Sequence, residues 1–97
     1  MVVGLARIVL FYGGSQSLKD KRQIIKSLIA QTQNQFHITV AEVDRQDQWQ
    51  VGVLGLAYVS TSSGHADEVL ARAVNFIATR KIEAEMLEYE TEIIHAF

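Results

Sequence analysis

The order in which two hydrophobic patterns alternate along the chain constrains the fold more than any other feature. Apolar runs rich in β-branched and aromatic residues, typical of strands, occupy residues 2–12, 36–43, 49–60 and 86–94. Apolar residues with helical spacing occupy residues 18–34 and 65–79. The sequence therefore predicts two strand–helix–strand halves, whose middle strands are joined by a polar hairpin loop at residues 44–48.

Each helical segment has a start signal and one apolar stripe. Ser17 is a good N-cap for the first helix, because its hydroxyl can accept a hydrogen bond from a backbone N–H. The expected buried stripe of this helix consists of Leu18, Ile25, Leu28, Ile29 and Thr32. The second helix follows a turn at residues 61–64, and its stripe consists of Ala66, Val69, Leu70, Ala73, Val74 and Ile77.

This arrangement predicts the α+β class with the ferredoxin-like βαββαβ fold, in which two helices cover one face of a four-stranded antiparallel sheet. The 97 residues, 48% of them hydrophobic, are enough for a single domain over residues 1–97 with its own core. Gly52 and Gly55 interrupt the third strand and indicate a bulge or a close approach of another segment.

The sheet is expected to keep an apolar face that the helices do not cover. In the third strand, Val51, Val53, Ala57 and Val59 alternate with Leu54, Leu56 and Tyr58, so both faces are apolar. Exposed apolar area of this size marks an interaction surface, and we expect a homodimer through the open sheet face. The alternative is that loops or residues 95–97 fold over it.

Composition excludes several classes of protein. The chain has no cysteine, which excludes disulfides, thiolate metal sites and cysteine nucleophiles. The three histidines form no ligand pair at helical or strand spacing, so we expect neither a metal nor a cofactor. The N-terminal apolar run is too short to span a bilayer and contains Arg7, so we expect no targeting segment, no membrane partner and a cytoplasmic location.

The net charge of −2 gives no general reason to expect a nucleic-acid-binding protein, but the charges are unevenly distributed. Cations gather in the first quarter of the chain, at Arg7, Lys19, Lys21, Arg22 and Lys26. Glutamates gather near the C-terminal end, at positions 83, 85, 88, 90 and 92. The pattern predicts a molecule with one basic corner and one acidic edge.

Two motifs resemble those of a known family. The segment Ser15-Gln16-Ser17-Leu18-Lys19-Asp20-Lys21-Arg22 resembles the Ser-Leu-Lys-x-Lys-Arg signature of the YlxP-like family of small bacterial proteins. A second group of residues is similar to the other signature of the family: Ala41-Glu42-Val43-Asp44, Gln46-Asp47, Trp49-Gln50, Gly55-Leu56-Ala57-Tyr58-Val59-Ser60 and Tyr89-Glu90. Gly13 departs from it, because the family has a proline before the glycine.

The resemblance covers essentially the whole chain and implies a ferredoxin-like fold. It implies no established catalytic activity, because the function of the family is unassigned. Its members tend to be encoded beside transcription and ribosome-maturation proteins. By association alone, this implies a role near RNA or the ribosome.

The start of the first helix is the leading candidate site. Unpaired N–H groups and the helix dipole favour an anion there, and Ser15 and Ser17 can add hydroxyl groups. Lys19, Lys21, Arg22 and Lys26 add charge, although cations oppose the dipole at this end of a helix. We therefore predict an anion- or RNA-binding face, with structural pairing to Glu42 or Asp44 as the alternative.

A second candidate group consists of Glu42, Asp44, Asp47 and Trp49. Clustered carboxylates can bind a hard cation or serve as acid and base, but no metal-loop spacing is present. Aspartate is common in turns, and tryptophan is a common core or interface anchor. Structural roles are therefore favoured, including an ion pair of Glu42 or Asp44 with Lys21 or Arg22 that pins the first motif.

These features favour a non-enzymatic binding module that contacts RNA or a ribosomal particle. The alternative is a small-molecule domain that senses an anionic metabolite at loops beside a dimer interface. Catalytic residues are not expected, because no base partners Ser15 or Ser17. Base stacking on the sheet, as in an RRM, is disfavoured, since Phe11 and Tyr58 are the only near matches to its aromatic positions.

Overall fold

The structure is a computed structural model that describes residues 1–14, 16–80 and 84–97. Its elements are β1 (Val2–Phe11), α1 (Leu18–Phe36), β2 (Thr39–Asp44), β3 (Val51–Ser60), α2 (Ser63–Thr79) and β4 (Glu85–His95). The predicted βαββαβ order is confirmed.

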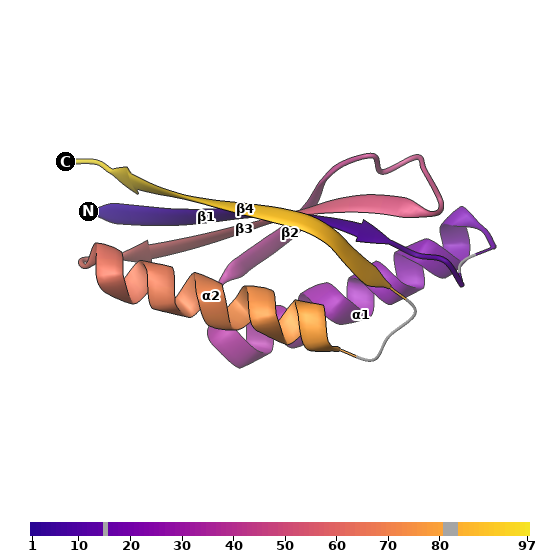
Figure 1. Ribbon diagram of the computed structural model, residues 1–97, viewed down its shortest axis with the longest axis horizontal. Helices are drawn as coiled ribbons and strands as arrows, with labels where there is room; N and C mark the ends of the chain where they lie inside the picture. Colours follow the sequence, from indigo (N-terminus) through magenta and orange to yellow (C-terminus); the bar gives the residue numbers. More distant parts are fainter. Residues whose placement is uncertain (15, 81–83) are drawn as a thin grey trace.

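The four strands form one antiparallel sheet in the order β2-β3-β1-β4, and both helices lie on the same side of it (Figure 1). The long central strands β1 and β3 pair over ten residues each, whereas β2 and β4 form the two edges. This is the ferredoxin-like arrangement that the sequence predicts.

The core lies between the helices and the even-numbered residues of the central strands. Ala6, Ile8 and Leu10 of β1 and Leu54 and Leu56 of β3 are buried there. The helices contribute Ile25 and Leu28 from α1 and Leu70, Ala73, Val74 and Ile77 from α2. Burial of each of the larger aliphatic side chains is worth about 1.5–3 kcal/mol, so this layer provides most of the stabilisation.

Helix α1 is longer than predicted, and β2 begins later. The helix continues to Phe36, where the aromatic ring packs edge-on against Phe76 of α2 with ring centroids 5.3 Å apart. His37 then ends the helix in the left-handed region, with φ of 53°, and its N–H donates to the Gln33 carbonyl. The prediction of a strand from Phe36 was wrong, because packing between the helices outweighs the β propensity of an aromatic residue.

The glycines of β3 accommodate close approaches. The β1–β3 register runs without a shift, so no bulge lies at Gly52 or Gly55 in this pairing. A Cβ on Gly55 would come within 2.8 Å of Val43 Cγ1, and one on Gly52 would meet the ring of Tyr12 at 3.0 Å. The register shifts lie on the edge strands, between Glu42 and Asp44 and opposite Val9 and Leu10.

The sheet face away from the helices is apolar but unevenly exposed. Val9 and Val53 lie opposite each other on this face, outside the helix-side core, and both are buried. Val43 and Val59 are 53% and 61% exposed. The connection between β2 and β3 rises from this side of the sheet (Figure 1). On this face, the exposed Val43 and Val59 thus lie around the buried Val9 and Val53.

Charge is distributed over opposite edges of the molecule. Arg7 of β1 lies 3.5 Å from Glu90 and 3.9 Å from Glu88 of β4, which places these glutamates on the open face. The basic helix α1 contacts edge strand β2, whereas α2 contacts β4. The helices in the described part of the chain are too short or too polar to cross a membrane.

Candidate functional site

Lys21 is the most unusual residue of the basic motif, because its side chain is fully buried. It lies one turn before Ile25 and therefore belongs to the stripe of α1 that faces the sheet, together with Leu28 and Thr32. Leu18 and Ile29, which were predicted to belong to this stripe, are only half-buried. Lys21 is consequently not a surface cation.

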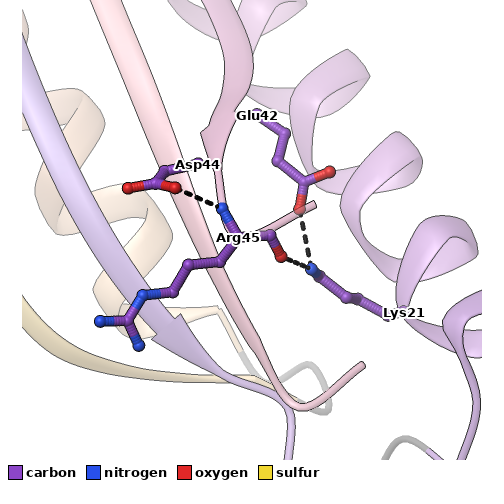
Figure 2. A network of polar contacts seen from close by, with 4 residues as sticks. All are labelled: Lys21, Glu42, Asp44 and Arg45. Carbon is purple, nitrogen blue, oxygen red and sulfur yellow. Dashed lines mark hydrogen bonds and ion pairs between the residues drawn. The ribbon is translucent and has the colours of Figure 1, made fainter. Parts of the chain in front are cut away.

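Two oxygen atoms surround the Lys21 ammonium (Figure 2). Nζ lies 3.0 Å from Glu42 Oε2 and donates a hydrogen bond to the Arg45 carbonyl oxygen at 2.7 Å. A buried ammonium requires such partners, because desolvation without them is very costly. The contact joins the first turn of α1 to the end of β2, and it matches the structural alternative for the motif, the pairing of Lys21 with Glu42.

The backbone around Arg45 presents this carbonyl. Arg45 adopts φ of 56°, and its N–H donates to Asp44 Oδ1 at 2.8 Å. The Asp44 side chain therefore holds the turn that directs the Arg45 carbonyl toward Lys21 (Figure 2). Asp44 acts in the same unit as Glu42, although it does not contact Lys21 itself.

Tyr12 completes the buried polar cluster that Lys21, Glu42 and the Arg45 carbonyl form. It was not predicted from the sequence as a site residue. Its hydroxyl is buried and has no hydrogen-bond partner among the described residues. The position of a Cβ on Gly52 would lie 3.2 Å from this hydroxyl and 3.3 Å from Glu42 Oε2, so the two oxygens converge over Gly52. Burial raises the pKa of Tyr12 far above its usual value, and the negative charge of Glu42 raises it further.

The remaining cations of the motif lie at the surface of α1. Lys19, Arg22 and Lys26 are all exposed. Their spacing of three and four residues places them along one side of the helix, over about 10 Å of its axis. The structure thus separates the motif into one buried cation and three accessible ones.

The start of α1 is capped by its own residues. Ser17 Oγ accepts a hydrogen bond from the Asp20 N–H at 3.1 Å, and Asp20 Oδ2 accepts one from the Gln16 N–H at 3.2 Å. The Asp20 carboxylate also offsets the cations near the positive end of the dipole. Ser15, the other predicted hydroxyl, lies outside the described residues.

A groove of about 430 Å³ runs between α1 and β2, directly beside two of the accessible cations. Arg22 and Lys26 line it together with the apolar Ile25, Ile29 and Ala30 and the polar Gln33 and Glu42. Gln33 Oε1 also accepts a hydrogen bond from the N–H of Val40 on β2. The groove therefore combines positive charge with an apolar wall.

The second candidate group does not assemble into one site. Glu42 contacts Lys21, whereas Asp47 and Trp49 are exposed in the connection after β2. No cluster of three or more metal-ligating side chains occurs in residues 1–14, 16–80 and 84–97. Glu42 and Asp44 therefore belong with the first motif, and Trp49 is a surface aromatic that is 42% exposed.

The aromatic positions of the sheet do not form a stacking platform. Tyr58 lies on the helix side, where its hydroxyl is 3.1 Å from His65 Nε2. Phe11 lies on the opposite face, as the alternation of β1 requires. The two aromatics on which a mode like that of the RRM would depend are thus on different faces.

The strand order, the helices on one side and the cationic helix define a ferredoxin-like α+β protein with a buried lysine–glutamate pair. The chain belongs to the DUF503 family, whose description is "Protein of unknown function (DUF503)" and whose model matches residues 3–91. It is 33% identical over 76 residues to "Uncharacterized protein YlxP" of Bacillus subtilis (strain 168), with 78% of this chain and 83% of that protein covered. The resemblance to the YlxP-like family is confirmed.

A solved structure has the same fold without a close sequence relationship. The "De novo designed protein Foldit4" matches with a TM-score of 0.56 and 12% identity, over 100% of both chains. At this identity, the similarity shows the fold alone.

Proposed function

We propose that this protein is a non-enzymatic binding module that contacts the phosphate backbone of RNA, free or in a ribosomal particle, through α1. The observation that carries the proposal is the row of exposed cations Lys19, Arg22 and Lys26 on one side of that helix. Phosphate contacts of this kind give salt-dependent binding that reads shape rather than sequence.

The buried contacts of Lys21 support this proposal, because they hold α1 in a fixed position on the sheet. Lys21 fixes the first turn of α1 to Glu42 and Arg45, so the outward cations are held on a rigid element. Ser17 supports the same turn as its N-cap. Because the cations lie on a rigid element, the protein loses less conformational entropy when it binds.

The test is binding of the purified protein to small ribosomal subunits and to a structured RNA fragment over a salt series. We expect saturable binding that weakens as salt rises and is lost in the Lys19→Glu, Arg22→Glu double variant. Both positions are exposed, so the variant should fold normally.

Arg72 provides a matched control, because it is an exposed cation on α2 that pairs with Glu68 at 2.6 Å. The Arg72→Glu variant should bind as the wild type does. Equal loss in both variants would point to bulk charge instead of the α1 row, and absence of binding at low salt would refute the nucleic-acid proposal.

We further propose that the protein works as a cytoplasmic homodimer, formed through the open sheet face. The exposure of Val43 and Val59 around the buried Val9 and Val53 supports this, since apolar area on a sheet is usually covered by a partner.

A second proposal is that the protein senses an anionic metabolite, and the groove beside α1 is the observation that favours it. Arg22 and Lys26 offer charge for a phosphate or carboxylate next to an apolar wall. A thermal-shift screen of phosphorylated metabolites and amino acids tests it. Stabilisation by one compound that persists with RNA present would favour sensing, and a flat screen would exclude it for the compounds tested.

A further inference from the structure

The edge strand β4 lies at the opposite edge of the sheet from β2 and the α1 row, and within the described residues it pairs with β1 alone. It is 11 residues long, and none of them is buried: Met86 and Ile93 are half-buried, and the other nine are exposed. Alternate N–H and C=O groups of an edge strand point away from the sheet and can pair with another strand. The molecule therefore presents a long free edge (Figure 1).

One face of this edge is acidic at every second residue. Glu88, Glu90 and Glu92 lie on the open face, where Arg7 is the only cation that pairs with them in the described part of the chain. The side chains of Glu88 and Glu90 remain 69% and 72% exposed. A hollow of about 340 Å³ lies beside Glu90 and Glu92. The row thus keeps uncompensated negative charge at a spacing of two residues.

The other face of the same edge is an apolar groove. A space of about 390 Å³ between β4 and α2 is lined by Ala71, Val74, Ala78, Met86 and Tyr89, with three polar residues around them. Tyr89 is 57% exposed although it faces the helix side. An apolar side chain from outside can enter this groove next to the Tyr89 ring.

These two faces match the two faces of one additional strand. Side chains of a strand alternate between faces, so a strand added to β4 directs every second residue to the glutamates and the others to the groove. We propose that the free edge of β4 binds an extended segment of another protein in which Lys or Arg alternates with apolar residues. The cations would meet Glu88, Glu90 and Glu92, and the apolar side chains would enter the α2–β4 groove.

A second copy of β4 does not fit this edge. Antiparallel pairing of two β4 strands about Glu90 would bring like charges opposite each other, which is destabilising. The occupant is therefore a basic–apolar strand whose backbone pairs with the edge of β4, whereas the homodimer that we propose uses the part of the open face around Val43 and Val59.

The test uses a labelled peptide of about nine residues that alternates Lys with Val, a length typical of a strand. The control peptide has the same composition, with all lysines in one block and all valines in another. We expect the alternating peptide to bind about tenfold more tightly in fluorescence anisotropy, because only it places charge and apolar groups on separate faces. Hydrogen exchange should show new protection of outward N–H groups of β4.

Two variants locate the binding on the two faces. Glu88→Gln with Glu92→Gln should weaken the alternating peptide by about fivefold or more through loss of charge pairs. Ala71→Lys places a cation in the groove at an exposed helix position and should weaken it as well. The Lys19→Glu, Arg22→Glu variant should leave it unchanged.

Equal affinity for the two peptides would overturn the proposal, because it would indicate general attraction to negative charge. Binding without added protection on β4 would also overturn it.

Discussion

Lys21 shows how a single buried charge can organise a motif. Within the sequence it looks like its neighbours Lys19 and Arg22, because all three lie in one short cationic run. Its position one turn before Ile25 places it on the buried side, while the others face solvent. Its partners lie far along the chain, and one of them is a backbone carbonyl. Helical spacing therefore predicts that the Lys21 side chain faces the sheet, but its partners can be identified only from the tertiary structure.

The buried pair predicts an asymmetric response to substitution. Glu42→Ala leaves the Lys21 ammonium buried with one carbonyl partner, and we expect a loss of about 3–5 kcal/mol in the free energy of unfolding. Lys21→Met should cost less, because methionine fills the space and the Glu42 side chain, 17% exposed, can turn its carboxylate toward water although Oε2 is buried in the native pair. Urea denaturation measures both. A larger loss for Lys21→Met than for Glu42→Ala would contradict this account of the pair.

Tyr12 predicts a stability change at high pH. Its pKa is raised in the folded protein above the unfolded value of about 10, so above this pH the unfolded chain loses the proton first. The ionisation of Tyr12 therefore leaves the free energy of unfolding unchanged below about pH 10 and lowers it as pH rises further. Tyr12→Phe should remove this decline, and denaturation at neutral and alkaline pH compares the two proteins. An identical decline in both would assign the effect to other groups.

Removal of the Tyr12 hydroxyl should also be tolerated at neutral pH. A buried hydroxyl without a partner carries its desolvation cost, so Tyr12→Phe should change the free energy of unfolding by no more than about 1 kcal/mol, in the stabilising direction. Thermal unfolding at neutral pH tests this. A clear destabilisation would show that the hydroxyl is hydrogen-bonded in solution.

At the scale of elements, the periodic patterns predicted all four strands and both helices. The errors lie in where these elements begin and end. The end of α1 was missed because no glycine marks it, and because the contact of Phe36 with Phe76 is a tertiary one. The register shift between Glu42 and Asp44 has no local sequence signal either, since it depends on pairing with β3. Element type follows from local spacing, whereas boundaries depend on what packs against them.

The C-terminal cap of α1 provides a prediction at this scale. His37 holds φ of 53°, a region in which a side chain is strained and glycine is not. His37→Gly should raise the free energy of unfolding by about 0.5–1 kcal/mol, after allowance for the greater freedom of glycine when unfolded. Chemical denaturation measures the change. A loss of stability would indicate that the imidazole makes a contact which outweighs the strain.

At the scale of the whole molecule, the open sheet face predicts the state of association. We expect sedimentation to give twice the mass of one chain, and Val43→Lys with Val59→Lys to shift the protein toward the monomer, because charge would enter the buried interface. Gln23→Lys, at an exposed position of α1, is the matched control. A monomeric wild type at high concentration would contradict the proposed dimer.

The candidate site was only partly accessible from the sequence. The cations of α1 and the association of Glu42 with the motif were recognisable from charge and from the expected ends of strands. Tyr12 was not singled out, although its even-numbered alternation with Ile8 and Leu10 places it on the helix side. The α2–β4 groove was not predicted. Its presence depends on how far β4 extends past α2 in the folded protein, and local sequence patterns do not determine this.

The most direct test of the central claim is the slope of RNA affinity against salt concentration. Each phosphate contact adds about 0.7–0.9 to the slope of log affinity against log salt. Lys19→Gln, Arg22→Gln and Lys26→Gln in one chain should therefore reduce the slope by about 2–3. Arg72→Gln should leave it unchanged. An unaltered slope in the triple variant would show that α1 does not contact the phosphates, and the claim would fail.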